Sequence, residues 1–268
     1  LQELHDAVCG DPVNAGYDPE TQSATESKVG IEFDVAAAQP LWDAASTGDT
    51  VTIPATLTQP EMTQEQLQKH LLADKLATKT TSLSGSSSNR ITNVKLAAEK
   101  INGVILQPGQ TFSYNDVVGQ RTKANGFKEA GAYSGGQVVQ EVGGGICQVA
   151  TTVFNAVYEA GYPVTEGRNH SLYISSYPTG RDAAIAYPDL DLTWVNDGTS
   201  DVLMRSRYTD SSLTVTLYGI DPGYVVSTQT GDWETGEPFK KRTKVDESEP
   251  EGTRYVKTAG ADGRSVTV

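Results

Sequence analysis

Residues 141–161, EVGGGICQVATTVFNAVYEAG, place three consecutive glycines before a cysteine and then an apolar pattern that recurs every three to four residues. Val149, Val153 and Val157 fall on one face of the helix that this pattern predicts over 148–160, and Gly161 ends it. Cys147 therefore stands at the start of a helix, where the positive end of the helix dipole stabilises a thiolate. The stretch predicts a domain organised around a helix that carries a reactive cysteine.

The glycines suggest the kind of chemistry that this cysteine could perform. Because glycines have no side chain, a substrate carbonyl could come close to the backbone N–H groups of Gly143, Gly144 and Gly145. Two such donors would form the oxyanion hole that acyl transfer requires. Glycine-rich loops before helices also bind phosphate, but no Lys-Ser/Thr pair follows here. Acyl transfer is the favoured interpretation.

A nucleophilic cysteine needs a proton acceptor, and His170 is the candidate. It follows Cys147 by 23 residues, a distance that one helix and a short return can span. A third group should orient the imidazole. We expect Asp182 in this role, with Asn169 or a backbone carbonyl as alternatives. His5 and His70, in the N-terminal part, are predicted to lie on helices as surface or satisfied core residues.

The composition excludes some classes of function. The 268 residues include 34 acidic and 21 basic ones, for a net charge of −13, which argues against nucleic-acid binding. No apolar run approaches the roughly 18 residues of a membrane helix. The chain starts at Leu1 without a signal peptide, so we expect a trimmed ectodomain whose targeting segment, or a membrane tether, lies outside this sequence.

The second cysteine, Cys9, lies in LQELHDAVCGDP, where Leu1, Leu4 and Val8 form a helical apolar stripe. A buried structural thiol is the expected state, although a Cys9–Cys147 disulfide stays open because pairing cannot be deduced from spacing. Three scattered histidines and two distant cysteines form no zinc site by local spacing. We predict no metal and no cofactor.

The N-terminal part, residues 1–76, is predicted to be a small α+β domain. Its expected elements are a strand at 28–34, a helix at 36–46, a second strand at 50–57, and a helix at 65–72 that Thr63 caps. Segment 78–89, TKTTSLSGSSSN, is Ser/Thr-rich and without periodicity, so it is predicted to be a linker or mobile loop.

The remainder divides into two parts. Ile91, Val94, Ala98 and Ile101 predict a helix that ends at Asn102-Gly103. Within residues 183–220, several segments either alternate apolar and polar residues or are continuously apolar, and turn motifs separate them. This pattern predicts an antiparallel meander. Residues 221–268 are charged and glycine-punctuated, and we expect a small β module there.

Several motifs in order resemble the VanW domain family, named for a protein encoded in some vancomycin-resistance clusters. They are INGVILQPGQTFSYNDVVG, GQRT, GGGICQVATTVFNAV, NHS, SYPTGRDA and LTVTLYG, and they cover roughly residues 80 to 220. Residues 1–76 are similar to a domain thought to bind peptidoglycan that often precedes VanW domains. EGTRYVKTAGADGRSVTV is similar, more weakly, to the end of the G-five module of bacterial surface proteins.

The resemblance implies a bacterial cell-wall setting outside the membrane. Some family members have been linked to L,D-transpeptidase activity, with the cysteine of GGGICQ as nucleophile. It implies that Cys147 attacks a stem peptide and that His170 and Asp182 assist. It also implies that the N–H groups of Gly144, Gly145 and Cys147 hold the oxyanion. The implied substrate-binding residues are Gly144, Gly145, Gln148, Ser171, Tyr177, Arg181 and Arg121. Either arginine would hold a peptide carboxylate. Gln148, Ser171 and Tyr177 match motif positions without a known role.

We therefore expect an α+β protein with a peptidoglycan-binding domain at 1–76, a catalytic domain at 77–220 and a β module at 221–268. Its expected function is that of a monomeric, extracellular L,D-transpeptidase whose partners are the stem peptides and glycan of peptidoglycan. One alternative is a wall-binding scaffold in which Cys147 is buried and inert. Another is a cysteine carboxypeptidase or endopeptidase that passes the acyl group to water, because acceptor choice depends on water exclusion.

Overall fold

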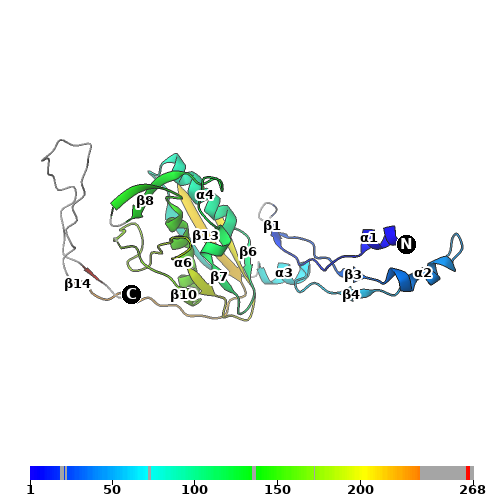
Figure 1. Cartoon of the computed structure of the whole chain (residues 1–268). Helices are drawn as coiled ribbons and strands as arrows, with labels where there is room; N and C mark the ends of the chain where they lie inside the picture. Colours follow the sequence, from blue (N-terminus) through cyan, green and yellow to red (C-terminus); the bar gives the residue numbers. More distant parts are fainter. Residues whose placement is uncertain are drawn as a thin grey trace.

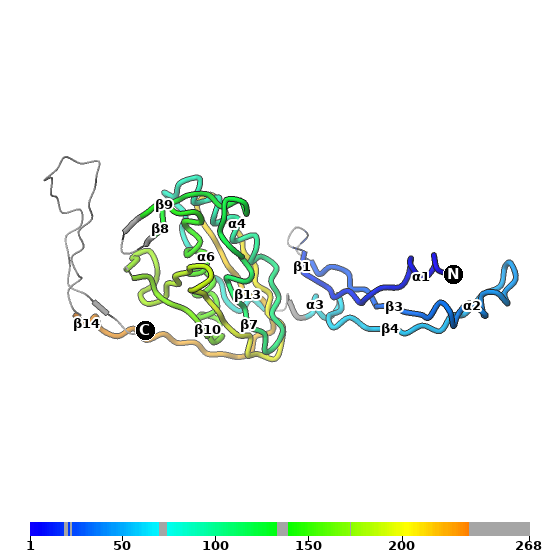
Figure 2. Tube along the Cα trace, viewed as in Figure 1, coloured from blue at the N-terminus to red at the C-terminus, as the bar shows by residue number. Residues whose placement is uncertain are grey.

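The computed structural model describes residues 1–18, 21, 23–71, 74–134, 137–171, 173–235 and 264–265. These residues form a mixed α+β structure with small antiparallel sheets, which confirms the predicted class (Figure 1). Among the described residues, none of the helices is both long and apolar enough to cross a bilayer. The arrangement has a central layered domain, with the N-terminal segment on one side of it (Figures 1 and 2).

The N-terminal segment consists of short elements. Two strand pairs are present, and its helices are α1 (Gln2–Val8), α2 (Val35–Asp43) and α3 (Gln64–Leu71). The strand pairs are β1 (Tyr17–Asp18) with β2 (Ser23–Ala24), and β3 (Gly30–Glu32) with β4 (Thr56–Thr58). The predicted strand at 28–34 and both predicted helices are confirmed, whereas the strand expected over 50–57 is only the short β4.

The central sheet has four antiparallel strands in the order β5-β13-β12-β6. They are β5 (Asp74–Ser82), β13 (Ser212–Gly219), β12 (Val202–Tyr208) and β6 (Val104–Leu106). Alternate residues of β13 are buried, and Leu213, Val215 and Leu217 belong to the main core. On β12, Met204 belongs to the same core, while Leu203 joins a second cluster with Leu67 of α3. The sheet is therefore covered on both faces.

Helices α4 (Ser88–Ile101) and α6 (Ile146–Ala160) pack on one face of this sheet, as Figure 1 shows. Ser87 caps α4 by accepting the N–H of Arg90 at 3.3 Å, and Val94, Ala97, Ala98 and Ile101 of α4 are buried. Most of α6 is buried between the sheet and the remaining loops. The helix that carries Cys147 is thus the centre of the main core.

Two smaller sheets complete the domain. Strands β10 (Val164–Glu166), β11 (Thr193–Val195) and β7 (Thr111–Ser113) form an antiparallel sheet, and β7 leads directly into α5 (Tyr114–Val118). A separate hairpin joins β8 (Glu129–Ser134) to β9 (Gln137–Val142), immediately before the glycine loop. The hairpin leads into the start of α6, whereas β10 and β11 lie beside Tyr162, just after the end of α6.

One prediction for the central part is wrong. Segment 78–89 is not a linker, because β5 continues to Ser82 and α4 begins at Ser88. The threonines of β5 pair across the sheet, with Thr80 Oγ1 2.8 Å from Thr214 Oγ1. Because β5 begins at Asp74, the predicted boundary between residues 76 and 77 falls inside a strand.

The predicted meander over 183–220 is only partly confirmed. β12 and β13 form its hairpin, but β11 pairs in the other sheet with β7 and β10. Residues 183–185 have no strand assignment, and Ala186 makes only an isolated bridge to Leu190.

Residues 221–235 run along the central domain in an extended path (Figure 2). The Tyr224 ring packs against Tyr162 at 6.0 Å, and its hydroxyl donates to Asp197 at 3.1 Å. The path ends in β14 (Glu234–Thr235), which pairs with β15 (Arg264–Ser265), and residues 264–265 are the only ones described beyond residue 235. The rest of the predicted β module at 221–268 lies outside the described residues.

Both cysteines are free thiols, so the Cys9–Cys147 disulfide does not form. The prediction that Cys9 is buried is wrong, because its exposure is intermediate and α1 has no buried residue. Leu4 and Val8, which suggested a core-facing stripe, are 39% and 43% exposed.

Candidate active site

The glycine loop places Cys147 in the first turn of α6. Gly145 is the N-cap residue and has a φ of 105°, a left-handed conformation that favours glycine. Gly161, with a φ of 85°, ends the helix as expected from its sequence. The cysteine is therefore held where unsatisfied backbone N–H groups and the helix dipole favour negative charge.

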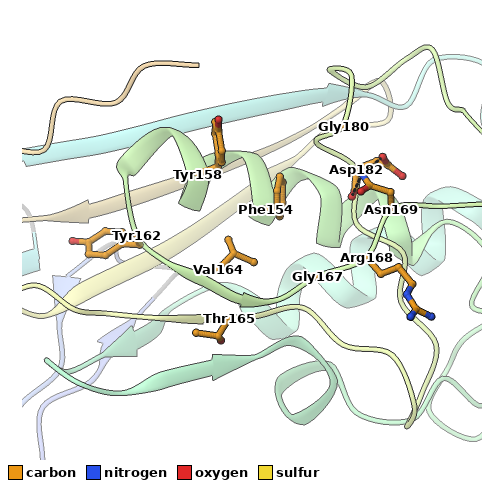
Figure 3. A pocket seen from close by; sticks show the side chains of 10 residues that line it. All are labelled: Phe154, Tyr158, Tyr162, Val164, Thr165, Gly167, Arg168, Asn169, Gly180 and Asp182. Atoms are coloured by element: carbon orange, nitrogen blue, oxygen red, sulfur yellow. Dashed lines mark hydrogen bonds between the residues drawn. The ribbon is translucent and has the colours of Figure 1, made fainter. Parts of the chain in front are cut away.

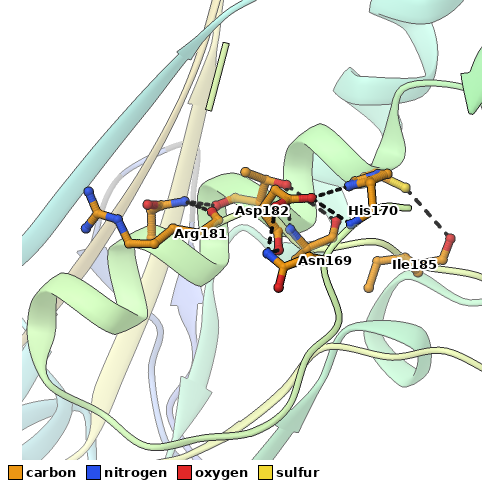
Figure 4. A network of polar contacts seen from close by, with 9 residues as sticks. Asn169, His170, Arg181, Asp182 and Ile185 are labelled. Atoms are coloured by element: carbon orange, nitrogen blue, oxygen red, sulfur yellow. Dashed lines mark hydrogen bonds and ion pairs between the residues drawn. The ribbon is translucent and has the colours of Figure 1, made fainter. Parts of the chain in front are cut away.

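His170 and Asp182 lie side by side (Figure 4), and His170 contacts the side chain of this cysteine. The Nδ1 atom of His170 is 2.6 Å from Oδ2 of Asp182, and the same oxygen accepts the backbone N–H of His170 at 2.8 Å. The ring is also hydrogen-bonded to the Cys147 side chain, which leaves Nε2 for the sulfur. The structure thus brings a thiol, an imidazole and a carboxylate into one chain of contacts.

The carboxylate of Asp182 is itself oriented by a neighbour. Asn169 donates its side-chain N–H to Oδ1 of Asp182 at 2.7 Å. Of the groups considered for the third position, Asp182 contacts the ring, and Asn169 holds Asp182. The Cys147 thiol also lies 3.7 Å from the carbonyl oxygen of Ile185.

The electrostatics of the pair favour a charged imidazole. Burial alone would lower the pKa of His170, but hydrogen bonds to Asp182 and Cys147 outweigh it and raise the pKa to about 9. Burial alone would raise the pKa of Asp182, but hydrogen bonds from the His170 ring and N–H and from Asn169 lower it below its ordinary value. The His170 and Asp182 side chains are only 9% and 13% exposed, so water screens this pair weakly.

Two polar residues of α6 hold the Asp182 segment in place. Thr151 Oγ1 accepts the backbone N–H of Ala183 at 3.0 Å, and Asn155 donates to the carbonyl oxygen of Arg181 at 2.7 Å. Cys147, Thr151 and Asn155 are spaced by four residues, so they share one face of the helix. Sequence reasoning missed Thr151 and Asn155, although polar residues at this spacing from Cys147 in a buried helix were a usable signal.

The glycine triplet is required by packing, which corrects the reason proposed for it. A Cβ on Gly144 would lie 2.4 Å from the carbonyl oxygen of Ala130 in β8, and a Cβ on Gly145 would lie 2.7 Å from Cγ of Arg90. The N–H of Gly144 donates to Glu141 at 3.1 Å, so it is not free for a substrate. Gly144 is therefore a packing residue and not an oxyanion donor.

Other backbone donors remain at the start of α6. The N–H groups of Gly145 and Cys147 have no acceptor among the residues that the structure describes. Both belong to the end of the helix whose N–H groups have no partner within it. Of the three predicted oxyanion donors, these two are left.

Arg121 lies near the thiol, as expected of a substrate-binding arginine. Its Nη1 donates to Asn115 Oδ1 at 2.7 Å, and its guanidinium carbon lies 5.6 Å from the Tyr114 ring and 5.8 Å from the Tyr187 ring. Burial lowers the pKa of Arg121, and the neighbouring Tyr114 and Cys147 side chains act in the opposite direction. Its Nε and Nη2 are buried without a hydrogen-bond partner among the described residues. Arg121 therefore offers two unused donors beside Cys147.

Two other predicted substrate-binding residues are placed elsewhere. Gln148 is buried, and its amide donates to Thr81 Oγ1 at 2.9 Å and to Ser82 O at 2.7 Å, so it ties α6 to β5. The Arg181 guanidinium faces away from His170 (Figure 4) and donates to Glu159 at 3.3 Å. Neither side chain is available to a substrate at Cys147.

Ser171 and Tyr177 lie on the loop that connects His170 to Asp182. Ser171 is exposed, and Tyr177 is partly buried. They are close in sequence to the two residues of the pair, but the hydrogen bonds described above do not include their side chains. Their predicted substrate-binding role stays a prediction.

The residues that line a surface pocket of about 470 Å³ include Asp182 but not Cys147 (Figure 3). Phe154 and Tyr158 of α6 form one wall, where their rings stack at 6.0 Å. Asn169 and Asp182 form its polar end. The pocket reaches the residues that orient His170, but not the thiol.

Comparison with known proteins shows what the central part of the chain is similar to. Residues 89–218 match the family model described as VanW like protein. The chain is 34% identical over 173 residues to the uncharacterized protein YoaR of Bacillus subtilis, a match that covers 63% of this chain and 57% of that protein. It is 29% identical over 114 residues to the vancomycin B-type resistance protein VanW of Enterococcus faecalis, covering 41% of this chain and 42% of that protein.

The chain thus spans about half the length of the curated relatives that it matches. No solved structure matches it. The matched range includes α4, the glycine loop, α6 and the loop that bears His170 and Asp182. Residues 89–218 of this chain are therefore similar to the VanW like proteins.

Proposed function

We propose that the chain is a cysteine acyltransferase of the bacterial cell wall, specifically an L,D-transpeptidase that forms 3–3 cross-links in peptidoglycan. The observation that carries the proposal is the contact chain Cys147–His170–Asp182 at the start of α6. A thiol activated by an imidazole, which a carboxylate orients, is the arrangement that nucleophilic acyl transfer uses.

In the first half of the reaction, the Cys147 thiolate attacks the carbonyl carbon of the diamino acid at position three of a donor stem. The bond to the terminal D-alanine nitrogen breaks, and imidazolium at His170 gives that nitrogen its proton. Free D-alanine leaves, and a thioester joins the tripeptide stem to Cys147. The pKa of about 9 for His170 supports this role, because the ring carries a proton to donate at neutral pH.

In the second half, the side-chain amine of another stem attacks the thioester carbonyl. The now neutral His170 takes a proton from that amine, and the bond between carbon and sulfur breaks. An amide cross-link forms, and Cys147 leaves as a thiolate beside imidazolium. Asp182 stabilises the positive ring without accepting its proton, because hydrogen bonds hold the pKa of Asp182 below its ordinary value.

The start of α6 would stabilise the tetrahedral intermediates. The N–H groups of Gly145 and Cys147 are the candidates to bind the developing oxyanion, since they have no other acceptor among the described residues. Arg121 would hold a substrate carboxylate with its two unused donors. Both assignments place negative charge where the helix dipole and a guanidinium favour it.

The setting of this reaction is part of the proposal. The similarity of residues 1–76 to a peptidoglycan-binding domain, and of the C-terminal end to a bacterial surface module, supports action outside the membrane. We propose a monomer that contacts the glycan through its flanking parts and the stem peptides through the VanW-like domain.

The test is intact-mass spectrometry of the reduced protein with a synthetic tetrapeptide stem. We expect a mass increase equal to the donor without D-alanine, and a cross-linked dimer once a stem with a free amine is added. Cys147→Ala should give neither product, while Cys9→Ser, the matched control on the other thiol, should give both. Folded protein that forms no adduct, or Cys147→Ala that still makes the dimer, would overturn the proposal.

The same experiment separates the alternatives. Release of free tripeptide with no dimer, in excess acceptor, would identify a carboxypeptidase. A Cys147 that iodoacetamide alkylates only after the fold is opened would identify a scaffold with an inert thiol.

A further inference from the structure

A second cluster of reactive side chains lies in the N-terminal segment, far from Cys147 in the sequence. One ligand atom from each of His5, Cys9 and Glu32 lies within 4.8 Å of the other two. The expectation that the histidines and cysteines form no metal site considered local spacing alone. It missed Glu32, which reaches the cluster from 27 residues beyond His5.

The local fold explains why these residues meet. His5 and Cys9 are four residues apart and share one face of the turn, with the Cys9 N–H bonded to the His5 carbonyl at 2.8 Å. Gly10, the next residue, forms an antiparallel bridge with Ile31 of β3. That bridge places the end of α1 beside Glu32.

The distances suit a tetrahedral metal ion. His5 Nε2 lies 3.1 Å from Glu32 Oε1, and two nitrogen or oxygen ligands of a tetrahedral zinc ion lie about 3.4 Å apart. Thiolate, imidazole and carboxylate together favour zinc over calcium or magnesium, which prefer oxygen ligands. The other ring nitrogen, Nδ1, is 3.2 Å from Oδ1 of Asp6. A carboxylate on the far nitrogen is the usual support of a histidine ligand.

The N-terminal segment also needs an anchor that its core does not supply. Helix α1 has no buried residue, so apolar packing does not hold it against the rest. Among the described residues of this segment, the buried aliphatic and aromatic side chains are few and mostly small: Ala15, Ala24, Phe33, Ala38 and Leu67. Small units of this kind are commonly stabilised by a disulfide or a metal, and Cys9 forms no disulfide.

We propose that His5, Cys9 and Glu32 bind one zinc ion that clamps α1 onto β3, with Asp6 as the positioning residue for His5. On binding, the Cys9 thiol loses its proton, neutral His5 gives its Nε2 lone pair to the metal, and Glu32 exchanges its hydrogen bond with His5 for a metal bond. Water fills the fourth position. The site is distinct from the proposed acyl-transfer centre and does not depend on it.

The test uses the full chain with Cys147→Ala, which leaves Cys9 as the one thiol. Chelation and dialysis first remove any bound metal. When zinc is then added back, we expect one zinc ion to bind per chain. When cobalt is added instead, we expect a near-ultraviolet thiolate-to-cobalt absorption band. Cys9→Ser and Glu32→Gln should each weaken zinc binding at least tenfold. Asp6→Asn should weaken it by about 10- to 100-fold, the range for a second-shell partner. Glu65→Gln, an exposed acidic residue on α3, is the matched control and should change nothing.

Zinc binding that is unchanged by Cys9→Ser, or cobalt binding without the thiolate band, would overturn the site. The clamp has its own readout, which is the rate of proteolytic cleavage within residues 1–10 measured by mass spectrometry. Zinc should slow that cleavage at least tenfold in the Cys147→Ala chain and not in the chain that also carries Cys9→Ser. Equal rates with and without zinc would refute the clamp.

Discussion

The charge state of His170 gives the sharpest test of the candidate site, through the substitution Asp182→Asn. Oδ2 of Asp182 accepts two N–H groups of His170, and Oδ1 accepts one from Asn169. An amide has one acceptor oxygen, so it cannot serve all three donors. The substitution therefore removes the negative charge and also breaks part of the hydrogen-bond set.

The size of the effect follows from the pKa. The folded-state pKa of His170 is about 9, against an ordinary value of 6.5. At 1.36 kcal/mol per pH unit, this difference favours the charged ring by roughly 3 kcal/mol, an amount that Asp182 and Cys147 share. Because the pKa is raised on folding, this stability is fully present below pH 6.5 and is lost as the pH rises through 9.

The assay is an NMR titration of the imidazole signals, with His5 and His70 as internal references. We expect the midpoint of the His170 titration to fall from about 9 to near 6.5 in Asp182→Asn. Without the Asp182 carboxylate, only the Cys147 contact raises the pKa of His170 against the lowering effect of burial. Urea unfolding should show that the variant no longer loses stability between these pH values. Asn169→Ala, which keeps the carboxylate, is the control and should lower the midpoint less. A midpoint that stays near 9 in Asp182→Asn would refute the reasoning and leave Cys147 as the source of the charge.

Three further substitutions test the surroundings of the site. Gly144→Ala should destabilise the fold by about 3 kcal/mol in urea unfolding, because its Cβ would lie 2.4 Å from Ala130 O; a negligible loss would mean that the loop relaxes freely. Thr151→Val should cost about 1–3 kcal/mol by leaving the buried Ala183 N–H without its acceptor, and should slow thioester formation; an unchanged rate would contradict its positioning role. Arg181→Gln should leave the acyl-transfer rate within about twofold, because the guanidinium faces away from His170; a large loss would return this arginine to the site.

Local signals explain which elements could be predicted. The α6 helix was predictable because its apolar period and its flanking glycines are adjacent in sequence. Strand β5 was not, because Thr78 and Thr80 gain their partners from β13, more than 130 residues away. A Ser/Thr-rich segment looks like a loop until its cross-strand neighbours are known.

The same distinction applies to the site. Cys147, His170 and Asp182 could be nominated from residue type, since acyl transfer restricts the choice to few groups. The role of the glycines could not, because the contact of Gly144 with β8 is set by packing. The orientation of the Arg181 side chain also depends on tertiary structure. Its partner Glu159 belongs to α6, 22 residues earlier in the sequence, and the two side chains meet only in the folded protein.

Two hydrogen bonds from backbone N–H groups hold together the two ends of the loop between His170 and Asp182. The Ala184 N–H donates to Arg168 O at 2.8 Å, and the His170 N–H donates to Asp182. The segment between these two hydrogen bonds can therefore change in length or composition without moving the His170 ring or the Asp182 carboxylate. The domain separates a fixed candidate site from an exchangeable segment, and if the proposed acyl transfer holds, a new acceptor specificity could evolve in that segment alone.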